Sequence, residues 1–220
     1  MNFLNKIRIK RGLIMNDFLK IVRERRSANK FIENIKIPRE DFNDIFRELS
    51  LAPSAFNLQH ARYYVVEDKE LMEKVYDASF KQYKIKTASA TIIVTGDKNA
   101  YLSADKIYEG SMMLGMIDKT DYEIMLNTIN SLYEGWGEEF KHEEAIRNAS
   151  LSAMLFMLLA KDKGWDTCPM IYFEKEKIGK LLNIPENEVP VLMITMGKMD
   201  KSSNKIRGYR KPAAEFVKFY

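Results

Sequence analysis

The most constraining feature of the sequence is a stretch that would be apolar on nearly every face of a helix. Residues 149–160 carry no charged side chain, and a charged run follows directly. A helix without a polar face has to be enclosed by other elements, so the rest of the chain is expected to fold around it. The stretch is shorter than the ~18 apolar residues that a membrane-spanning helix needs. It therefore predicts a core helix over residues 144–163, ended by Gly164.

Length and charge are typical of one globular domain. The chain has 220 residues, 46% of them hydrophobic, and Lys and Arg exceed Asp and Glu by only four. Mixed charge of this kind does not indicate nucleic-acid binding. A single cysteine excludes an internal disulfide, and two histidines argue against a structural zinc site, so no metal is expected.

The N-terminus is basic, but it lacks the apolar run and the cleavage site of a targeting peptide. We therefore expect residues 1–14 to be a disordered extension and residues 15–220 to form a single domain. Because no stretch predicts a membrane helix, the expected location is the cytoplasm.

Hydrophobic periodicity predicts helices and strands in mixed order. The expected helices cover residues 16–24, 38–51, 70–83, 101–139 (as a pair), 144–163 and 178–182. Short β-branched or aromatic runs predict strands at residues 63–66, 90–95 and 189–196. An apolar tail, residues 212–220, also favours a strand. These elements predict an α+β domain.

Familiar catalytic motifs are absent from the sequence. No glycine-rich nucleotide loop follows a strand, and no serine lies in a Gly-x-Ser-x-Gly turn. Cys168 has no evident histidine partner along the chain. An enzyme of this composition is expected to rely on a cofactor for its chemistry.

A basic cluster closes the first predicted helix, where Arg25, Arg26 and Ser27 are followed by Asn29. Two guanidinium groups beside a hydroxyl suit a phosphate, because arginine binds oxyanions through paired donors and stays charged. The same residues could equally be cations that only stabilise a helix C-terminus. The residues alone leave both interpretations open.

Two further segments carry polar or distinctive residues. Residues 52–60 combine a proline, small side chains and the amides of Asn57 and Gln59, which could face a heterocycle. The alternative is a plain helix-to-strand connection. Residues 168–173 follow the core helix, and Cys168 could there be only a small hydrophobic residue in a buried crossover.

Taken in order, these segments resemble the signature of the FMN-dependent nitroreductase family. The shared parts are Arg-Arg-Ser, Ala-Pro-Ser-Ala-x-Asn-x-Gln, Gly-Trp-Asp-Thr-Cys-Pro-Met and Arg-x-x-Arg-Lys-Pro. The resemblance runs from Met15 to Tyr220, with bacterial NAD(P)H nitroreductases as the nearest branch. It implies a three-layer α+β fold with a central mixed sheet of about four strands flanked by helices. It also implies a C-terminal strand exchanged with the partner subunit.

The resemblance further implies a homodimer that binds FMN at the subunit interface and takes electrons from NADH or NADPH. The residues implied at the FMN phosphate and ribityl chain are Arg25, Arg26, Ser27 and Arg210, with Asn29 near the pyrimidine edge. Those implied to meet the ring from the other subunit are Pro53, Ser54, Ala55 and Asn57. Those implied beside the ring are Gln82, Pro169, Met170 and Ile171, whose segment offers a main-chain N–H to N5. No catalytic side chain is implied, because the flavin N5 carries the chemistry.

One position departs from the family pattern. Tyr172 stands where glycine is common, and a phenol there could narrow the substrate pocket or stack on a substrate. The helices expected over residues 101–139 resemble the variable insertion that covers the substrate side. Ordinary core filling is the alternative for most of their apolar residues.

The implied activity is reduction of nitroaromatics, quinones or related acceptors by NAD(P)H through ping-pong hydride transfer. Two alternatives stay open. The chain could be a relative specialised for another flavin reaction, such as enoate reduction or dehalogenation, or a flavin-binding protein without turnover.

Overall fold

The computed structural model describes residues 18–203 and 205–220. A short helix at residues 18–24 comes first. The later elements are α2 (Arg39–Leu49), β1 (Ala61–Val66), α3 (Lys69–Asp77), α4 (Tyr83–Thr87), β2 (Ala90–Asp97), α5 (Ala104–Met113), α6 (Lys119–Asp162), β3 (Asp166–Met170), α7 (Lys175–Leu181) and β4 (Glu188–Gly197). The expected extension at residues 1–14 and the start of the first helix at Asn16 lie outside the described residues.

The centre of the fold is a four-stranded sheet in the order β1-β2-β4-β3. All three pairings are antiparallel. The expectation of a mixed sheet was therefore wrong for the described chain, in which parallel pairing is confined to an isolated bridge between Ser27 and Thr167. Every strand of the sheet therefore runs opposite to each neighbour with which it forms hydrogen bonds.

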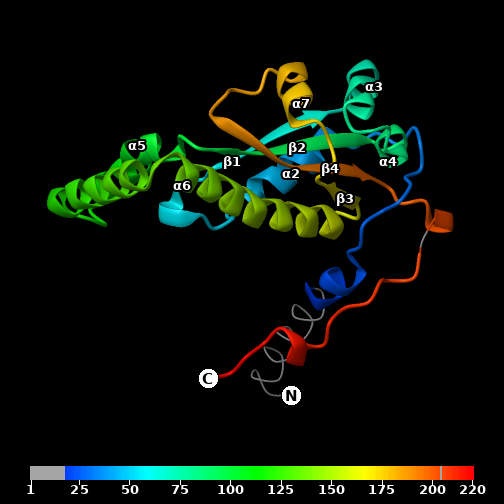
Figure 1. Cartoon of the computed structure of the whole chain (residues 1–220). Helices are drawn as coiled ribbons and strands as arrows, with labels where there is room; N and C mark the ends of the chain where they lie inside the picture. Colours follow the sequence, from blue (N-terminus) through cyan, green and yellow to red (C-terminus); the bar gives the residue numbers. More distant parts are fainter. Residues whose placement is uncertain (1–17, 204) are drawn as a thin grey trace.

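Helices cover both faces of the sheet, which confirms the three-layer α+β architecture (Figure 1). On one face α2 and α6 enclose a core that includes Phe156 and Ile194. On the other face α3 and α7 enclose a core that includes Met193 and, from α7 itself, Ile178. Adjacent residues of β4 thus serve opposite cores, as the alternation of side chains along a strand requires.

The predicted core helix forms the second half of α6, which runs along the sheet (Figure 1). Its approach to the sheet depends on Gly96 of β2, where a Cβ atom would lie 2.2 Å from the carbonyl oxygen of Ala145. The first half of α6 and α5 form an arm that projects beyond the sheet (Figure 1). Gly137 interrupts α6 between the two halves with a φ of 75°.

Two local expectations were wrong. The helix expected over residues 70–83 ends at Asp77, and α4 begins only at Tyr83, because Phe80 and Lys81 between them take left-handed φ values of 52° and 55°. The break is tied to a distant segment, since the Glu174 N–H donates to the Ala78 carbonyl at 2.9 Å. The second difference is β3, which the sequence did not predict. Pro169 fits there because β3 is an edge strand, where a missing N–H leaves no inner ladder bond unmade.

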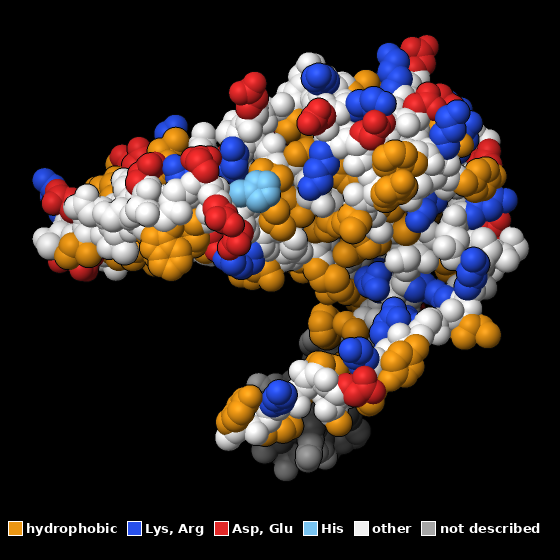
Figure 2. Space-filling model, viewed as in Figure 1, with side chains coloured by type: hydrophobic (Ala, Val, Ile, Leu, Met, Phe, Trp, Pro, Cys, Tyr) orange, Lys and Arg blue, Asp and Glu red, His pale blue; other side chains and the backbone are white. Residues whose placement is uncertain are grey.

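The C-terminal tail leaves the sheet and runs beside the helix at residues 18–24 (Figure 1). Residues 205–220 are exposed, and their regular structure is a short turn of helix at Ala213–Glu215. In the space-filling view the tail and the α5–α6 arm stand apart, with an open hollow between them (Figure 2). Exchange of a C-terminal strand with a partner stays a prediction.

Candidate functional site

The basic cluster predicted from sequence docks on the edge strand β3. The Ala28 N–H donates to the Thr167 carbonyl at 3.0 Å, and Ser27 forms the isolated bridge with the same residue. This pairing holds the segment after the first helix against β3 at Thr167, although the two lie far apart in sequence. Ser27 and Asn29 are exposed and Arg25 and Arg26 are half-buried. The structure therefore brings the first and third predicted segments together.

Positive charge gathers at this junction. Burial lowers the pKa of Arg25, and the nearby guanidinium groups of Arg207 and Arg210 lower it further, while the Cys168 thiol acts in the opposite direction. Arg207 also donates to the Arg23 carbonyl at 2.6 Å and to the Arg25 carbonyl at 3.1 Å. The space-filling view shows blue side chains where the tail leaves the body (Figure 2).

The three guanidinium groups of Arg25, Arg207 and Arg210 repel one another. A bound dianion would reduce this repulsion. Sequence reasoning selected Arg210 from the Arg-Gly-Tyr-Arg segment and missed Arg207, three residues earlier.

A second group of residues lies beside Cys168 of β3. The Lys84 ammonium of α4 is 3.5 Å from the Cys168 sulfur. Just before α4, the Gln82 side-chain amide donates to the Tyr172 carbonyl at 2.6 Å. Sequence reasoning singled out Gln82 but not Lys84, which lies just past the helix expected over residues 70–83.

The chain that follows Cys168 reaches the surface at Ile171. Pro169 is half-buried, Met170 is buried and Ile171 is 75% exposed. The expected loop at these positions is thus the end of a strand followed by an exposed turn, so its backbone is held by sheet hydrogen bonds up to Met170.

The predicted loop at residues 53–59 has a strained backbone. Phe56, Asn57 and Gln59 have positive φ values of 49°, 53° and 52°, a region in which side chains other than glycine are uncommon. Such strain persists only where surrounding contacts fix it, and it is frequent at functional sites.

The contacts that fix this loop come from α5, α6 and the loop itself. The Ala55 N–H donates to the Asn148 side-chain oxygen at 2.7 Å, and Tyr108 donates to the Phe56 carbonyl at 2.9 Å. The Gln59 N–H donates to the Ser54 hydroxyl at 2.9 Å. Asn57 is exposed at the tip.

The two predicted regions do not meet within one chain. The loop at residues 53–59 leads into β1, whereas the basic cluster docks on β3, and these are the two outer strands of the sheet. Two strands lie between them, which separates the edges by roughly 14 Å at the usual spacing. One chain therefore holds these two predicted segments at opposite edges of the sheet.

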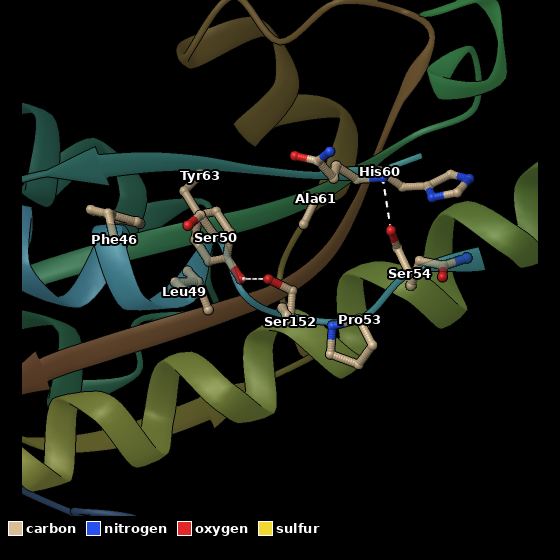
Figure 3. A pocket seen from close by; sticks show the side chains of 12 residues that line it. Phe46, Leu49, Ser50, Pro53, Ser54, His60, Ala61, Tyr63 and Ser152 are labelled. Atoms are coloured by element: carbon tan, nitrogen blue, oxygen red, sulfur yellow. Dashed lines mark hydrogen bonds between the residues drawn. The ribbon is translucent and has the colours of Figure 1, made fainter. Parts of the chain in front are cut away.

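A cavity of 170 Å³ lies beneath the loop (Figure 3). Pro53, Ser54, Tyr63 and Ser152 line it, and the Tyr63 and Ser152 hydroxyls are 2.7 Å apart. Cavities for organic ligands usually measure about 300–1,000 Å³, so this one is too small for a ring cofactor.

Residues 22–198 match the family model described as "Nitroreductase family".

The chain belongs to the nitroreductase family.

One relative among the nitroreductases is the Bacillus subtilis protein named "Putative NAD(P)H nitroreductase MhqN". It is 51% identical over 205 residues, which is 93% of this chain and all of the relative. The crystal structure of ydfN from Bacillus subtilis superposes with a TM-score of 0.91 at 50% identity, covering 94% of this chain and all of ydfN. A structure from Exiguobacterium sibiricum, described as a complex with FMN, has a TM-score of 0.84 at 28% identity, covering 92% and 97% of the two chains.

The residues of this nitroreductase fit FMN as a ligand. The guanidinium cluster at β3 suits its phosphate, and the exposed turn at Ile171 leaves backbone available to a ring. In the described part of the chain, no group of three or more His, Cys, Asp or Glu side chains could hold a metal ion. No described helix is long and apolar enough to cross a membrane.

Cys168 is buried beside Lys84, but flavin hydride chemistry needs no thiolate. We expect Cys168→Ser to keep most of the NAD(P)H-oxidising activity, because a hydroxyl still accepts a hydrogen bond from the Lys84 ammonium. Cys168→Ala, which removes that acceptor, is the matched comparison. Steady-state turnover per bound FMN is the measurement. A fall of more than about a hundredfold in Cys168→Ser with FMN retained would give the thiol a catalytic role.

His60 is fully buried directly before β1, and its Nε2 atom lies 3.1 Å from the Tyr133 hydroxyl. Burial lowers its pKa from 6.5 to about 4, although Asp97 opposes the shift and Arg62 adds slightly to it. Because the unfolded chain takes up the proton first, stability is lost as the pH falls from 6.5 toward 4. Between pH 7.5 and 5.0 the expected loss is about 2 kcal/mol.

Urea unfolding at these two pH values tests the prediction. His60→Gln should remove that share of the pH dependence, whereas His142→Gln, at an exposed histidine, should keep it. An unchanged pH dependence in His60→Gln would contradict it.

Proposed function

We propose that the protein is an FMN-dependent oxidoreductase that uses NADH or NADPH to reduce nitroaromatics, quinones or related acceptors. The observation that carries the proposal is the cluster of Arg25, Arg207 and Arg210 beside β3, which a phosphate group would neutralise. Membership of the nitroreductase family supports the same cofactor.

Each part of the half-site at β3 has a role under this proposal. Arg25, Ser27 and Arg210 would hold the phosphate, with Arg26 and Asn29 along the same segment. Gln82 and the backbone of residues 169–171 would lie along the ring. When bound, FMN supplies hydride acceptance and donation at its N5 position. The chain itself binds and orients the cofactor and excludes water, so no side-chain acid or base is required.

The homodimer is part of the proposal. Pro53, Ser54, Ala55 and Asn57 form the second half-site, which lies at the opposite edge of the same sheet. A two-fold dimer would place this loop of one subunit against the β3 half-site of the other and create two equal FMN sites. The hollow between the tail and the α5–α6 arm is open, and a partner subunit could bind there (Figure 2).

The test is an absorption spectrum of the purified protein followed by anaerobic titration with NADH and with NADPH. We expect a flavin spectrum that either nucleotide bleaches and that a quinone restores. A flavin spectrum that neither nucleotide bleaches would favour a flavin-binding protein without turnover. If only an enoate or a halogenated acceptor re-oxidises the reduced flavin, the result would favour a relative specialised for another flavin reaction. The cytoplasmic location stays a prediction.

A further inference from the structure

Two exposed aromatic residues stack on each other beside the proposed ring site. Phe80 precedes α4 and Tyr172 follows β3, and their rings lie 4.1 Å apart with 21° between their planes. Despite this contact, Phe80 is 48% and Tyr172 64% exposed. A ring that is covered on one face and still so exposed presents its other face to solvent.

The backbone next to this pair is strained. Phe80 and Lys81 both adopt left-handed φ values, which for residues of this kind store strain. The Lys81 N–H donates to the Tyr76 carbonyl at 3.1 Å. Across the gap, the Gln82 amide bonds the Tyr172 carbonyl, which ties the two segments together. The pair is therefore preorganised and needs little ordering when a ligand arrives.

Simple core packing does not explain the arrangement. Aromatic residues that fill a core are buried, whereas these two lie on the surface next to Ile171, which is itself 75% exposed. Their neighbour Phe173 points into the core and is 6% exposed. The chain thus buries one aromatic residue of this turn and leaves Tyr172 outside.

We infer that the Phe80–Tyr172 pair selects the electron acceptor by stacking on planar fused-ring compounds, with the outer face of Tyr172 as the contact surface. This inference rests on the proposed function, since it places the acceptor beside Ile171. A planar two-ring acceptor, such as a naphthoquinone, can extend the stack as a third layer. A one-ring acceptor covers less of the Tyr172 face and gains less from it.

The experiment compares acceptors and a ligand that is not reduced. Steady-state kcat/KM is measured for menadione and for 1,4-benzoquinone in the wild-type holoprotein and in Tyr172→Gly, Tyr172→Phe and Phe80→Leu. Calorimetry gives the affinities of 2-naphthoate and benzoate for the same proteins. FMN content and melting temperature establish that each variant is folded, and Tyr172→Leu replaces Tyr172→Gly if the latter is not. Tyr83→Leu, at an exposed aromatic residue of α4 outside the stack, is the control.

We expect Tyr172→Gly to lower the menadione-to-benzoquinone ratio of kcat/KM, and the naphthoate-to-benzoate ratio of affinities, by about fivefold or more. Phe80→Leu should lower both ratios by less. Tyr172→Phe and Tyr83→Leu should leave both within about twofold of wild type. Unchanged or raised ratios in Tyr172→Gly would overturn the inference. A wild-type protein that does not oxidise NAD(P)H would instead contradict the proposed function, and the calorimetric ratios would still decide the stacking role.

Discussion

Replacing Arg210 by alanine is expected to weaken FMN binding about tenfold or more, because a charge-assisted contact to the phosphate contributes about 1.5–3 kcal/mol. The positive charge of Arg210 lowers the pKa of Arg25, so the two guanidinium groups lie near each other. The measurement is the FMN dissociation constant from fluorescence titration of protein stripped of cofactor.

Two controls isolate the phosphate. Lys211→Ala removes the neighbouring positive charge of the same exposed tail and should change FMN affinity little. Riboflavin, which lacks the phosphate, should bind wild type and Arg210→Ala with similar affinity. Equal FMN affinity of wild type and Arg210→Ala, or an equal loss for riboflavin, would exclude Arg210 as a phosphate ligand.

Deleting residues 212–220 is expected to abolish the dimer and with it most of the bound flavin. This tail is apolar, yet within one chain Phe216 is 68% and Phe219 94% exposed. An exposed apolar tail of this kind is a site for association with another chain. If the tail adds an edge strand to the partner's sheet, folding and dimerisation are coupled and the truncated chain loses both.

Mass in solution and flavin content per chain are the measurements. Phe219→Ala tests the same contact with a single substitution. The Phe219 side chain is exposed within its own chain, so its removal should lower dimer stability only if a partner subunit covers it. Lys218→Ala is the matched control at the preceding position. A truncated protein that remains a fully flavinated dimer would rule out strand exchange.

Local patterns in the sequence were sufficient for most of the elements. The apolar run that predicted a core helix is the half of α6 that packs on the sheet, because a helix without a polar face can be stable in water only when enclosed. Strand and helix types at β1, β2, β4 and α2 also follow from periodicity, which depends on neighbours along the chain. The order of the short motifs was enough to identify the family.

The candidate site was only partly predictable for the same reason. Arg25 and Arg210 stand out as charged residues within motifs, whereas Arg207 and Lys84 are ordinary cations until the fold places them beside β3. The stack of Phe80 on Tyr172 joins segments that no local rule connects.

The sequence by itself therefore determined most helices, most strands, the core helix and the family, because hydrophobic periodicity and short motifs are properties of neighbouring residues. Only the tertiary structure decided that residues 166–170 pair as an edge strand and that the helix expected over residues 70–83 ends at Asp77. It also decided that the two predicted half-sites lie at opposite edges of one sheet. Each of these outcomes depends on hydrogen bonds and packing between residues far apart in the chain, whose energies no local pattern contains.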